Sequence, residues 1–593
     1  MDNQRNLLLA VVLCGLLLFG WDAAMTYFYP QPKEPVRAVA AEGSAGSAVQ
    51  PGRSNRDGGL VDPTAVALEK RDLASALKSS QRVRIAAPEI TGSIDLVGAR
   101  IDDLTLRAHR EHVEKNSGPV RLFSPAGTPA QHFAQFGWLG EGVRVPDGQS
   151  MWRAEGGPLA PGKPVTLTWP NGQGQVFRIE LSVDREYMIT AKQTGGNAAG
   201  GPIVLRPFAT VSRTSKTASY DSWQLHSGPI GSFGNAVSFD WDYDDIAEAP
   251  RGRVTPEGRA DWIGFTDIYW MSALIPQGNT GTEADFRAAG RDLYRADVIY
   301  DPVTVPSGRQ ISRTTRLFAG AKESTALNAY QAAGVPQFEN AIDWGWFGVI
   351  EKPILWLLRQ LYGIAGNFGV AIILLTLIVR LVMFPIAQKQ FASMAAMRAL
   401  QPKMKAILDR YKDDKPRQQQ EIMALYRSEG VNPLAGCLPI LLQIPIFYGL
   451  YKVLMVAIEM RHKPFALWIE DLSAPDPAHI LNLFGLLPFT PPSFLGIGPL
   501  AVLLGISMWA TFRLNPPATD PIQAQMFKLM PWLLMFAMAP FAAGLLIYWI
   551  TNNLLTLAQQ TYLYSKHPQL RAQAQKDKQD QDRAAARDAK AKG

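Results

Sequence analysis

Residues Gln360 to Gln388 read QLYGIAGNFGVAIILLTLIVRLVMFPIAQ, and Arg380 is the only charged residue in that stretch. A helix of about 20 apolar residues, rising about 1.5 Å per residue, crosses a bilayer core about 30 Å thick. The stretch therefore predicts a transmembrane helix that carries one arginine. Because the helix crosses the membrane, the segments before and after it must lie on opposite sides of the bilayer.

Other stretches almost free of charge predict further spans. The uncharged run from Leu529 to Ser565 would extend about 55 Å as a single helix, so we divide it at Ala539-Pro-Phe-Ala-Ala-Gly544. We predict the first span as an uncleaved signal anchor; the alternative is a cleaved signal peptide, although no small-x-small site follows cleanly. Six transmembrane helices are expected, at residues 1–29, 367–388, 434–456, 495–512, 526–541 and 544–564.

A long polar region separates the first two spans. Residues 30–82 are rich in Pro, Gly, Ala and Ser, which is typical of a flexible linker. Within residues 83–340, apolar and polar side chains alternate from Phe177 to Val183, and the preceding Asn171-Gly172 is a strong hairpin signal. Many short strands between Gly/Pro turns predict a large β-sandwich domain. Further strands are expected at Ile90–Leu96, Ile203–Arg206 and Ile311–Leu317.

Two helical segments flank the second span. Residues 341–366 include an amphipathic stretch with Trp356, Arg359 and Tyr362, as expected for a helix in the membrane interface. Residues 389–429 predict a coiled-coil hairpin of two antiparallel helices, and a solvated connector is the alternative. The apolar seam of this segment steps by three and four residues, at Met397, Leu400, Met404, Ile407 and Tyr411.

The distribution of basic residues predicts the orientation. Residues 389–429 carry nine Lys/Arg against five Asp/Glu, and the tail at residues 565–593 carries eight against four. Both segments belong in the cytoplasm by the positive-inside rule. With six spans, both termini are then cytoplasmic, and the β domain and the loop at residues 457–494 lie on the other side. The net charge of +7 is therefore assigned to membrane topology, not to nucleic-acid binding.

Arg380 is the first candidate functional residue. An arginine near the centre of a membrane helix costs about 2.5–3.5 kcal/mol on insertion scales, so a functional role is the default hypothesis. The alternative is snorkelling toward the cytoplasmic end at Gln388, about 12 Å away. Thr376 and Gln388 lie on the same helix face as Arg380. Phe384 lies on this face between Arg380 and Gln388. A partly polar face favours a water-filled, protein-lined cavity.

Two other spans offer polar partners for this face. Gln443 lies in the middle of the third span, one turn before Phe447. Asn552 and Asn553 lie in the sixth span, with Tyr548 one turn before Asn552. These residues are candidates for a groove with Arg380, although amides in membranes also join helices together.

The sequence shows no convincing catalytic or cofactor site, and we do not expect an enzyme. Residues Gly157 to Lys163 imitate a phosphate-binding loop, but Pro164 stands where Ser or Thr must contact magnesium. His109 and His112 lie in strand and loop surroundings and lack metal-ligand spacing. With only two cysteines, Cys14 and Cys437, a disulfide framework is not expected. No metal, nucleotide or other cofactor is predicted.

Four motifs stand out in the apolar part of the chain: Leu375-Thr-Leu-Ile-Val-Arg380, Asn432-Pro-Leu-Ala-Gly-Cys-Leu-Pro439, Gln443-Ile-Pro-Ile-Phe447 and Gly544-Leu-Leu-Ile-Tyr548. They resemble the most distinctive stretches of the YidC/Oxa/Alb family of membrane-protein insertases. The motifs follow one another in order over residues 340–565. The region at residues 83–340 is similar to the periplasmic domain of the Gram-negative members only in size and class.

The resemblance implies a protein of the bacterial inner membrane that inserts and folds nascent membrane proteins, alone or with the Sec translocon. It implies that Arg380 lies in a hydrophilic groove open to the cytoplasm and the lipid bilayer, with Thr376 and Phe447 near the substrate path. It further implies a supersandwich-like periplasmic domain. The hairpin would receive substrate, and the basic tail would contact ribosomes. No cofactor is implied.

Two other classes of function remain as alternatives. A transporter or lipid flippase would bind an anionic solute at Arg380, although such proteins usually show internal repeats with broken helices, which the sequence lacks. In the other alternative, the β domain is a sugar-binding or enzymatic module, and the spans only anchor it to the membrane.

Overall fold

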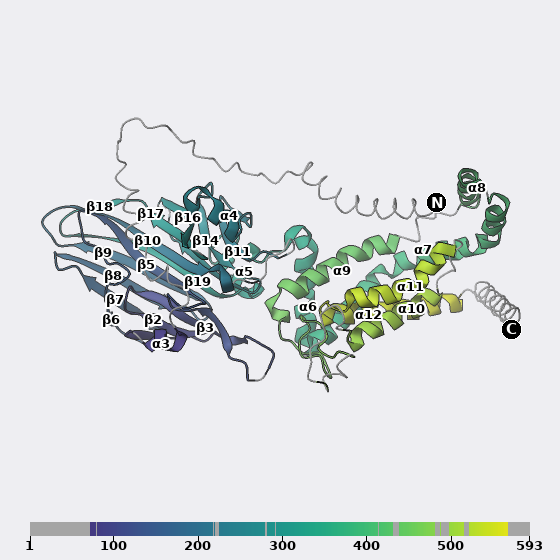
Figure 1. Ribbon diagram of the computed structural model, residues 1–593, viewed down its shortest axis with the longest axis horizontal. Helices are drawn as coiled ribbons and strands as arrows, with labels where there is room; N and C mark the ends of the chain where they lie inside the picture. Colours follow the sequence, from purple (N-terminus) through teal and green to yellow (C-terminus); the bar gives the residue numbers. More distant parts are fainter. Residues whose placement is uncertain are drawn as a thin grey trace, which may run out of the picture.

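The chain is described by a computed structural model with a β-sandwich and a bundle of long helices (Figure 1). The predicted first span, the predicted linker up to residue 71 and all but the first two residues of the basic tail lie outside the described residues. The structure describes residues 72–566 except 79, 115, 218, 220–224, 279–280, 291, 413, 431–437, 481–486, 488–496 and 515–520.

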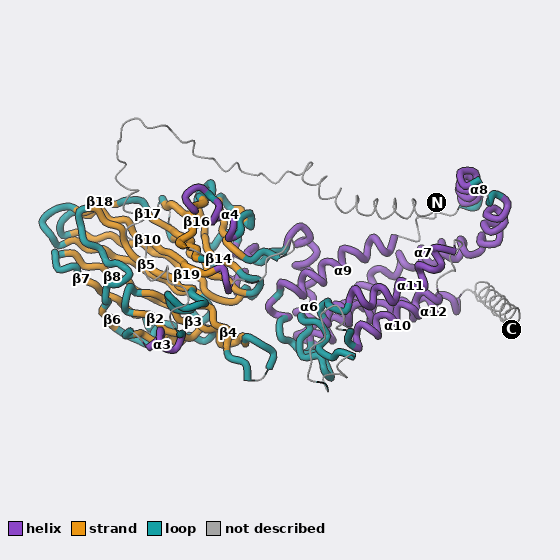
Figure 2. Tube along the Cα trace, in the orientation of Figure 1, coloured by secondary structure: helices purple, strands orange, loops and turns teal. Residues whose placement is uncertain are grey.

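The sandwich consists of two antiparallel sheets, as predicted (Figure 2). The first has the order β1-β2-β3-β5-β10-β17-β16-β13, with β4 beside β3 and β18 beside β10. Its strands are β1 Arg82–Ala86, β2 Ile90–Asp95, β3 Arg100–Arg110, β4 Pro119–Phe123, β5 His132–Glu141, β10 Ile203–Thr214, β13 Arg253–Val254, β16 Thr282–Gly290, β17 Leu293–Tyr300 and β18 Val303–Val305.

The second sheet has the order β12-β11-β14-β15-β19-β9-β8-β7-β6. Its strands are β6 Arg153–Glu155, β7 Val165–Pro170, β8 Gln175–Val183, β9 Met188–Asn197, β11 Gly228–Phe233, β12 Ala236–Ser238, β14 Ala260–Thr266, β15 Trp270–Pro276 and β19 Arg309–Ala321.

The predicted hairpin is confirmed by the pairing of β7 with β8. Trp169 lies opposite Phe177, and Gly172 in the turn has a φ of +76°, which glycine adopts without steric cost. Apolar residues of β8 are buried while the polar residues between them, such as Arg178, are exposed. The period-two pattern thus marks a strand with one face on the core and one in solvent.

Central strands extend beyond their predicted limits. The prediction stopped at Arg206, but β10 continues to Thr214, and its last eight residues are all buried. A strand covered on both faces loses the alternation that identifies a half-exposed strand. The same reason explains why β17, which is buried along its whole length, was not predicted.

The helical part begins after the sandwich and contains the candidate membrane segments. Its helices are α6 Gly348–Ala365, α7 Phe368–Arg410, α8 Lys415–Ser428, α9 Leu438–Val456, α10 Pro499–Leu514, α11 Pro521–Met538 and α12 Ala543–Lys566. Three shorter helices belong to the sandwich side, namely α3 Leu73–Lys78, α4 Tyr243–Glu248 and α5 Ser324–Ala332. Arg380 lies on α7, which packs against α6, α9 and α12.

One helix among the described residues, Phe368–Gln388, is long and apolar enough to cross a membrane. Gln443–Val456 and Pro499–Arg513 are apolar but shorter. The count of six spans therefore stays a prediction. Apolar side chains of these helices face outward with no protein cover, among them Leu381 and Val382, which are 63% and 73% exposed. Large uncovered apolar surface is what contact with lipid would require.

The predicted bounds of the fifth span are corrected by α11. The helix covers Pro521–Met538, whereas the prediction was 526–541. Proline is tolerated at the first helical position, which allows the earlier start. The end follows from Pro540, since the residue before a proline is disfavoured in helical conformation. The next helix, α12, begins only at Ala543, so two separate helices lie where the last two spans are predicted; that each crosses the membrane stays a prediction.

No break separates the membrane helix from the segment after it, since α7 is one helix of 43 residues. Its end contacts α8: Gln418 Nε2 donates to Leu408 O at 3.1 Å, and Lys403 Nζ lies 2.5 Å from Glu429 Oε1. These pairs run in opposite chain directions, as in antiparallel helices. In Figure 1, α8 lies at the end of the helical part that is farther from the sandwich.

Candidate functional site

Arg380 lies within the apolar part of α7 and contacts one neighbouring helix, α12. Its Nε donates to Asn552 Oδ1 at 2.7 Å, and its Nη2 donates to Thr556 Oγ1 at 2.6 Å and to Asn552 O at 3.3 Å. The guanidinium is thereby held by side-chain and backbone oxygens of two residues one helical turn apart. Of the predicted partners, Asn552 is the one that the structure brings to the arginine.

All partners of Arg380 among the described residues are neutral. No Asp or Glu in the described part of the chain forms an ion pair with it. Asn552 is 9% exposed, and Arg380 is partly buried. An amide and a hydroxyl satisfy guanidinium donors, but they leave the positive charge in place.

The face of α12 that meets Arg380 repeats every four residues. Tyr548, Asn552 and Thr556 are spaced i, i+4, i+8, which places them along one side of a helix. The Thr556 hydroxyl also donates to Asn552 O at 2.7 Å, a bond within α12 that fixes its orientation. Thr556 was not among the predicted residues, although its spacing from Asn552 would have indicated it.

Gln443 and Phe447 bring α9 to the same side of α12. The side-chain amide of Gln443 donates to the Tyr548 hydroxyl, and the Phe447 ring meets Trp549 edge-on at 5.0 Å between ring centroids. The structure therefore gathers the predicted residues into two neighbouring contacts, Arg380 with Asn552 and Gln443 with Tyr548. They meet along a single helix, α12.

Thr376 and Asn553 face other neighbours. The Thr376 side chain is buried, and its hydroxyl donates to Ile372 O of its own helix at 2.7 Å. Asn553 Nδ2 donates to Ser507 Oγ on α10 at 2.9 Å, which joins two helices. Of the two adjacent asparagines, only Asn552 therefore belongs to the arginine site, and Asn553 acts as the joining amide that was considered as the alternative.

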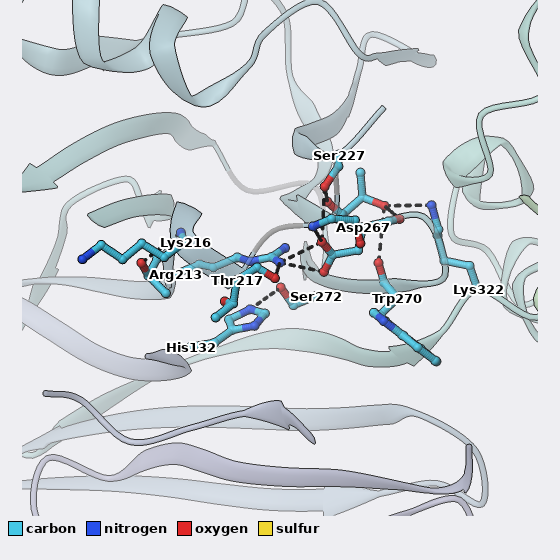
Figure 3. Close-up of polar contacts among 12 residues, drawn as sticks. His132, Arg213, Lys216, Thr217, Ser227, Asp267, Trp270, Ser272 and Lys322 are labelled. Carbon is cyan, nitrogen blue, oxygen red and sulfur yellow. Dashed lines mark hydrogen bonds and ion pairs between the residues drawn. The ribbon is translucent and has the colours of Figure 1, made fainter. Parts of the chain in front are cut away.

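A second polar cluster lies inside the sandwich, and the sequence did not reveal it (Figure 3). Arg213 Nη2 donates to both carboxylate oxygens of Asp267, at 2.8 and 2.7 Å. His132 Nε2 lies 2.9 Å from Ser272 Oγ, and Lys322 Nζ donates to a threonine hydroxyl on β14 at 2.9 Å. These residues come from strands far apart in sequence, so no local spacing predicts their contact.

Burial and charge set the ionisation of this cluster. Burial alone would raise the pKa of Asp267, but the Arg213 guanidinium and its hydrogen bonds hold that pKa below its ordinary value. Burial, with help from Arg213, lowers the pKa of His132 well below its ordinary value. Burial also lowers the pKa of Lys322 to about 8. Since all four residues are buried, the cluster is interpreted as a structural network of the core.

Metal binding finds no support in the described part of the chain, where no group of three or more His, Cys, Asp or Glu could hold an ion. His109 instead lies 3.0 Å from Glu323 Oε1. The described chemistry is thus a cation with neutral partners among apolar helices, and a closed ionic network in the sandwich.

Comparison with known proteins matches both parts of the chain. The family described as "60Kd inner membrane protein" matches residues 360–571, and the one described as "YidC periplasmic domain" matches residues 82–357. A relative from Zymomonas mobilis is 43% identical over 95% of this chain and 96% of its own. Another from Methylorubrum extorquens is 41% identical over 94% of each chain. Both are named "Membrane protein insertase YidC".

Proposed function

Since the chain belongs to the YidC family of membrane protein insertases, we propose that Arg380 and its partners on α12 line the groove through which substrate segments enter the membrane. The named relatives support the insertase function itself. The observation that carries the proposal for Arg380 is its set of partners. A cation among apolar helices, bound only by neutral groups among the described residues, is available to a passing negative charge.

The polar residues lower the barrier for a substrate's extracellular segment. A polar or acidic segment loses several kcal/mol of hydration when it enters hydrocarbon without partners. Arg380 attracts acidic residues, and Asn552 with Gln443 offers hydrogen bonds along the way. The membrane potential acts on acidic residues in the same direction. Apolar side chains that face outward, such as Val382, guide the emerging substrate helix into lipid.

The remaining topology completes the proposal. Family membership makes the sandwich a periplasmic domain and the helical part an inner-membrane unit. We propose six spans, both termini in the cytoplasm, and α8 with the end of α7 as a cytoplasmic hairpin. The hairpin lies at the end of the helical part that is farther from the sandwich, which supports its placement on the cytoplasmic side of the membrane (Figure 1). Folding of substrates, cooperation with the Sec translocon, and ribosome contacts through the hairpin and the basic tail belong to the same proposal.

The transporter or flippase alternative has no support among these observations. The relatives that cover nearly the whole chain are named as insertases, not as transporters or flippases.

Site-specific photo-cross-linking to a ribosome-stalled nascent membrane protein tests the groove. A photoreactive residue is placed at Phe447 or Thr556, which lie beside the arginine site, and at Leu381 as a matched control on α7. Leu381 is adjacent to Arg380 in sequence but 63% exposed toward the outside of the bundle.

We expect cross-links to the nascent chain from positions 447 and 556 early in insertion, and later or weaker ones from 381. Equal cross-linking from all three positions, or cross-linking from 381 alone, would contradict a groove at Arg380.

A further inference from the structure

A pocket of about 690 Å³ lies where the sandwich meets the helical part. Its walls come from the end of β3 and the following loop, from the end of α6 and the start of α7, and from the loop after α9. The pocket is separate from the arginine site, since none of the residues that surround Arg380 lines it.

Direct contacts between the two parts hold these walls in place. Arg461 Nη1 and Nη2 donate to Arg110 O at 2.8 Å and to Glu111 O at 2.9 Å. The same guanidinium lies over the Trp270 ring, 5.1 Å from its centroid. Ser324 Oγ donates to Glu459 Oε1 at 2.5 Å from the other side. The pocket is thus bounded by fixed elements, as a binding site requires.

Basic groups exceed acidic groups in the lining. Two carboxylates are present: Glu323 contacts His109, and Glu459 accepts from Ser324 at Oε1, while its Oε2 is buried without a hydrogen-bond partner among the described residues. The Lys463 ammonium has no hydrogen bond or ion pair among the described residues. Four permanent cations line the pocket, namely Arg110, Arg359, Arg461 and Lys463. The balance is positive even when the histidines are neutral, which favours an anionic ligand.

Three histidines add hydrogen-bond donors to this lining. His109, His112 and His462 line the same pocket although they are far apart in sequence. Burial, together with nearby Arg461 and the other two histidines, lowers the pKa of His462. Neutral or protonated, each imidazole can donate a hydrogen bond to an oxyanion. The described residues include no metal-binding group here, so these donors point to an anion.

The position of the pocket indicates the source of the anion. Its floor contains Tyr362 and Phe368, whose rings stack 4.0 Å apart, and Phe368 is the first residue of the apolar span in α7. On α6, Trp356 and Ile364 are 62% and 82% exposed, as expected of side chains in contact with lipid. The pocket therefore lies at the level of the headgroups, beside the sandwich.

From this geometry we infer that the pocket binds the phosphate of an anionic phospholipid in the periplasmic leaflet. The inference rests on the proposed orientation of the chain, with the sandwich in the periplasm. A bound headgroup would neutralise part of the excess charge and would link the sandwich to the membrane surface beside α6. The chemistry recognised is a phosphate group, which a lipid headgroup or free phosphate can supply.

Native mass spectrometry of the full chain in detergent tests the inference. Phosphatidylglycerol is titrated against the protein, with zwitterionic phosphatidylcholine as the comparison lipid and inorganic phosphate as a competitor. The variant is Lys463→Gln with His112→Gln, because neither side chain joins the sandwich to the helices in the described contacts. The matched control is Lys163→Gln, which removes one exposed lysine from a turn of the sandwich before β7.

We expect the double variant to weaken phosphatidylglycerol binding by about 5–10-fold, as loss of one charged partner does, and the control to leave it unchanged. Phosphatidylcholine should bind weakly to every form. Equal phosphatidylglycerol binding by the wild type and the double variant would overturn the inference. It would also be overturned if the substitutions affected inorganic phosphate alone. Cross-linking at Phe447 reports on the insertion groove separately, so the two proposals can fail independently.

Discussion

The two parts of the molecule give an arginine opposite surroundings. In the sandwich, Arg213 donates to both carboxylate oxygens of Asp267, and the pair carries no net charge (Figure 3). In the helical part, Arg380 is surrounded by apolar helices and has an amide, a hydroxyl and a carbonyl as partners. The same side chain is neutralised in one part and left charged in the other.

The difference agrees with the groove that we propose for the helical part. A folded domain gains nothing from an uncompensated buried charge, because desolvation makes it costly. An insertase groove must attract polar segments, and a carboxylate beside Arg380 would occupy the charge that does so. In the proposed groove, neutral partners hold the guanidinium in position and leave its charge available to a substrate.

Breaking the sandwich pair should have the largest effect. Arg213→Ala leaves Asp267 buried without its cation, which typically costs about 3–5 kcal/mol. We expect a corresponding fall in the free energy of unfolding of the full chain, measured by urea denaturation with near-UV circular dichroism. The control Arg178→Ala, at an exposed position on β8, should change stability by less than about 0.5 kcal/mol. Similar values for both variants would show that the pair is not structural.

Lys322 should give a smaller effect that depends on pH. Its folded-state pKa of about 8 lies below the unfolded value of about 10.4, so unfolding takes up a proton between these values. The free energy of unfolding should therefore rise with pH from about 8 to about 10, by at most about 1.4 kcal/mol per unit. Lys322→Met should flatten this slope. An unchanged slope in the variant would assign the pH dependence to other groups.

Asn552→Asp places a carboxylate beside Arg380, as Asp267 lies beside Arg213 in the sandwich. This substitution should have the smallest effect on stability. The new carboxylate would pair with Arg380. The thermal midpoint in detergent should therefore differ from that of the wild type by no more than a change of about 1 kcal/mol in the free energy of unfolding would produce. Insertion of substrates with acidic extracellular segments should nevertheless fall by about tenfold, because the positive charge is neutralised. Asn553→Asp, directed at α10 by the Asn553–Ser507 contact, is the matched control. Full insertion by the Asn552 variant would show that the free charge is not required.

The sequence predicted those features that local patterns encode. The alternation in β8 and the Asn171-Gly172 turn correctly predicted a hairpin, since both act within a few residues. The single charge in the stretch around Arg380 correctly marked a long apolar helix. The sequence could not predict which of the adjacent asparagines, Asn552 or Asn553, contacts Arg380. The choice depends on how α12 is rotated about its axis. The Arg213–Asp267 pair depends on a contact between sheets and leaves no local signal.

The role assigned to Arg380 can be measured in proteoliposomes that contain the wild type, Arg380→Lys or Arg380→Ala. The substrates are two membrane proteins that differ only in an acidic or a neutral extracellular segment. If the charge matters, the alanine variant should insert the acidic substrate about tenfold more slowly, the lysine variant should retain most of the rate, and the neutral substrate should change less. Insertion of the acidic substrate by the alanine variant at the wild-type rate would contradict the charged groove.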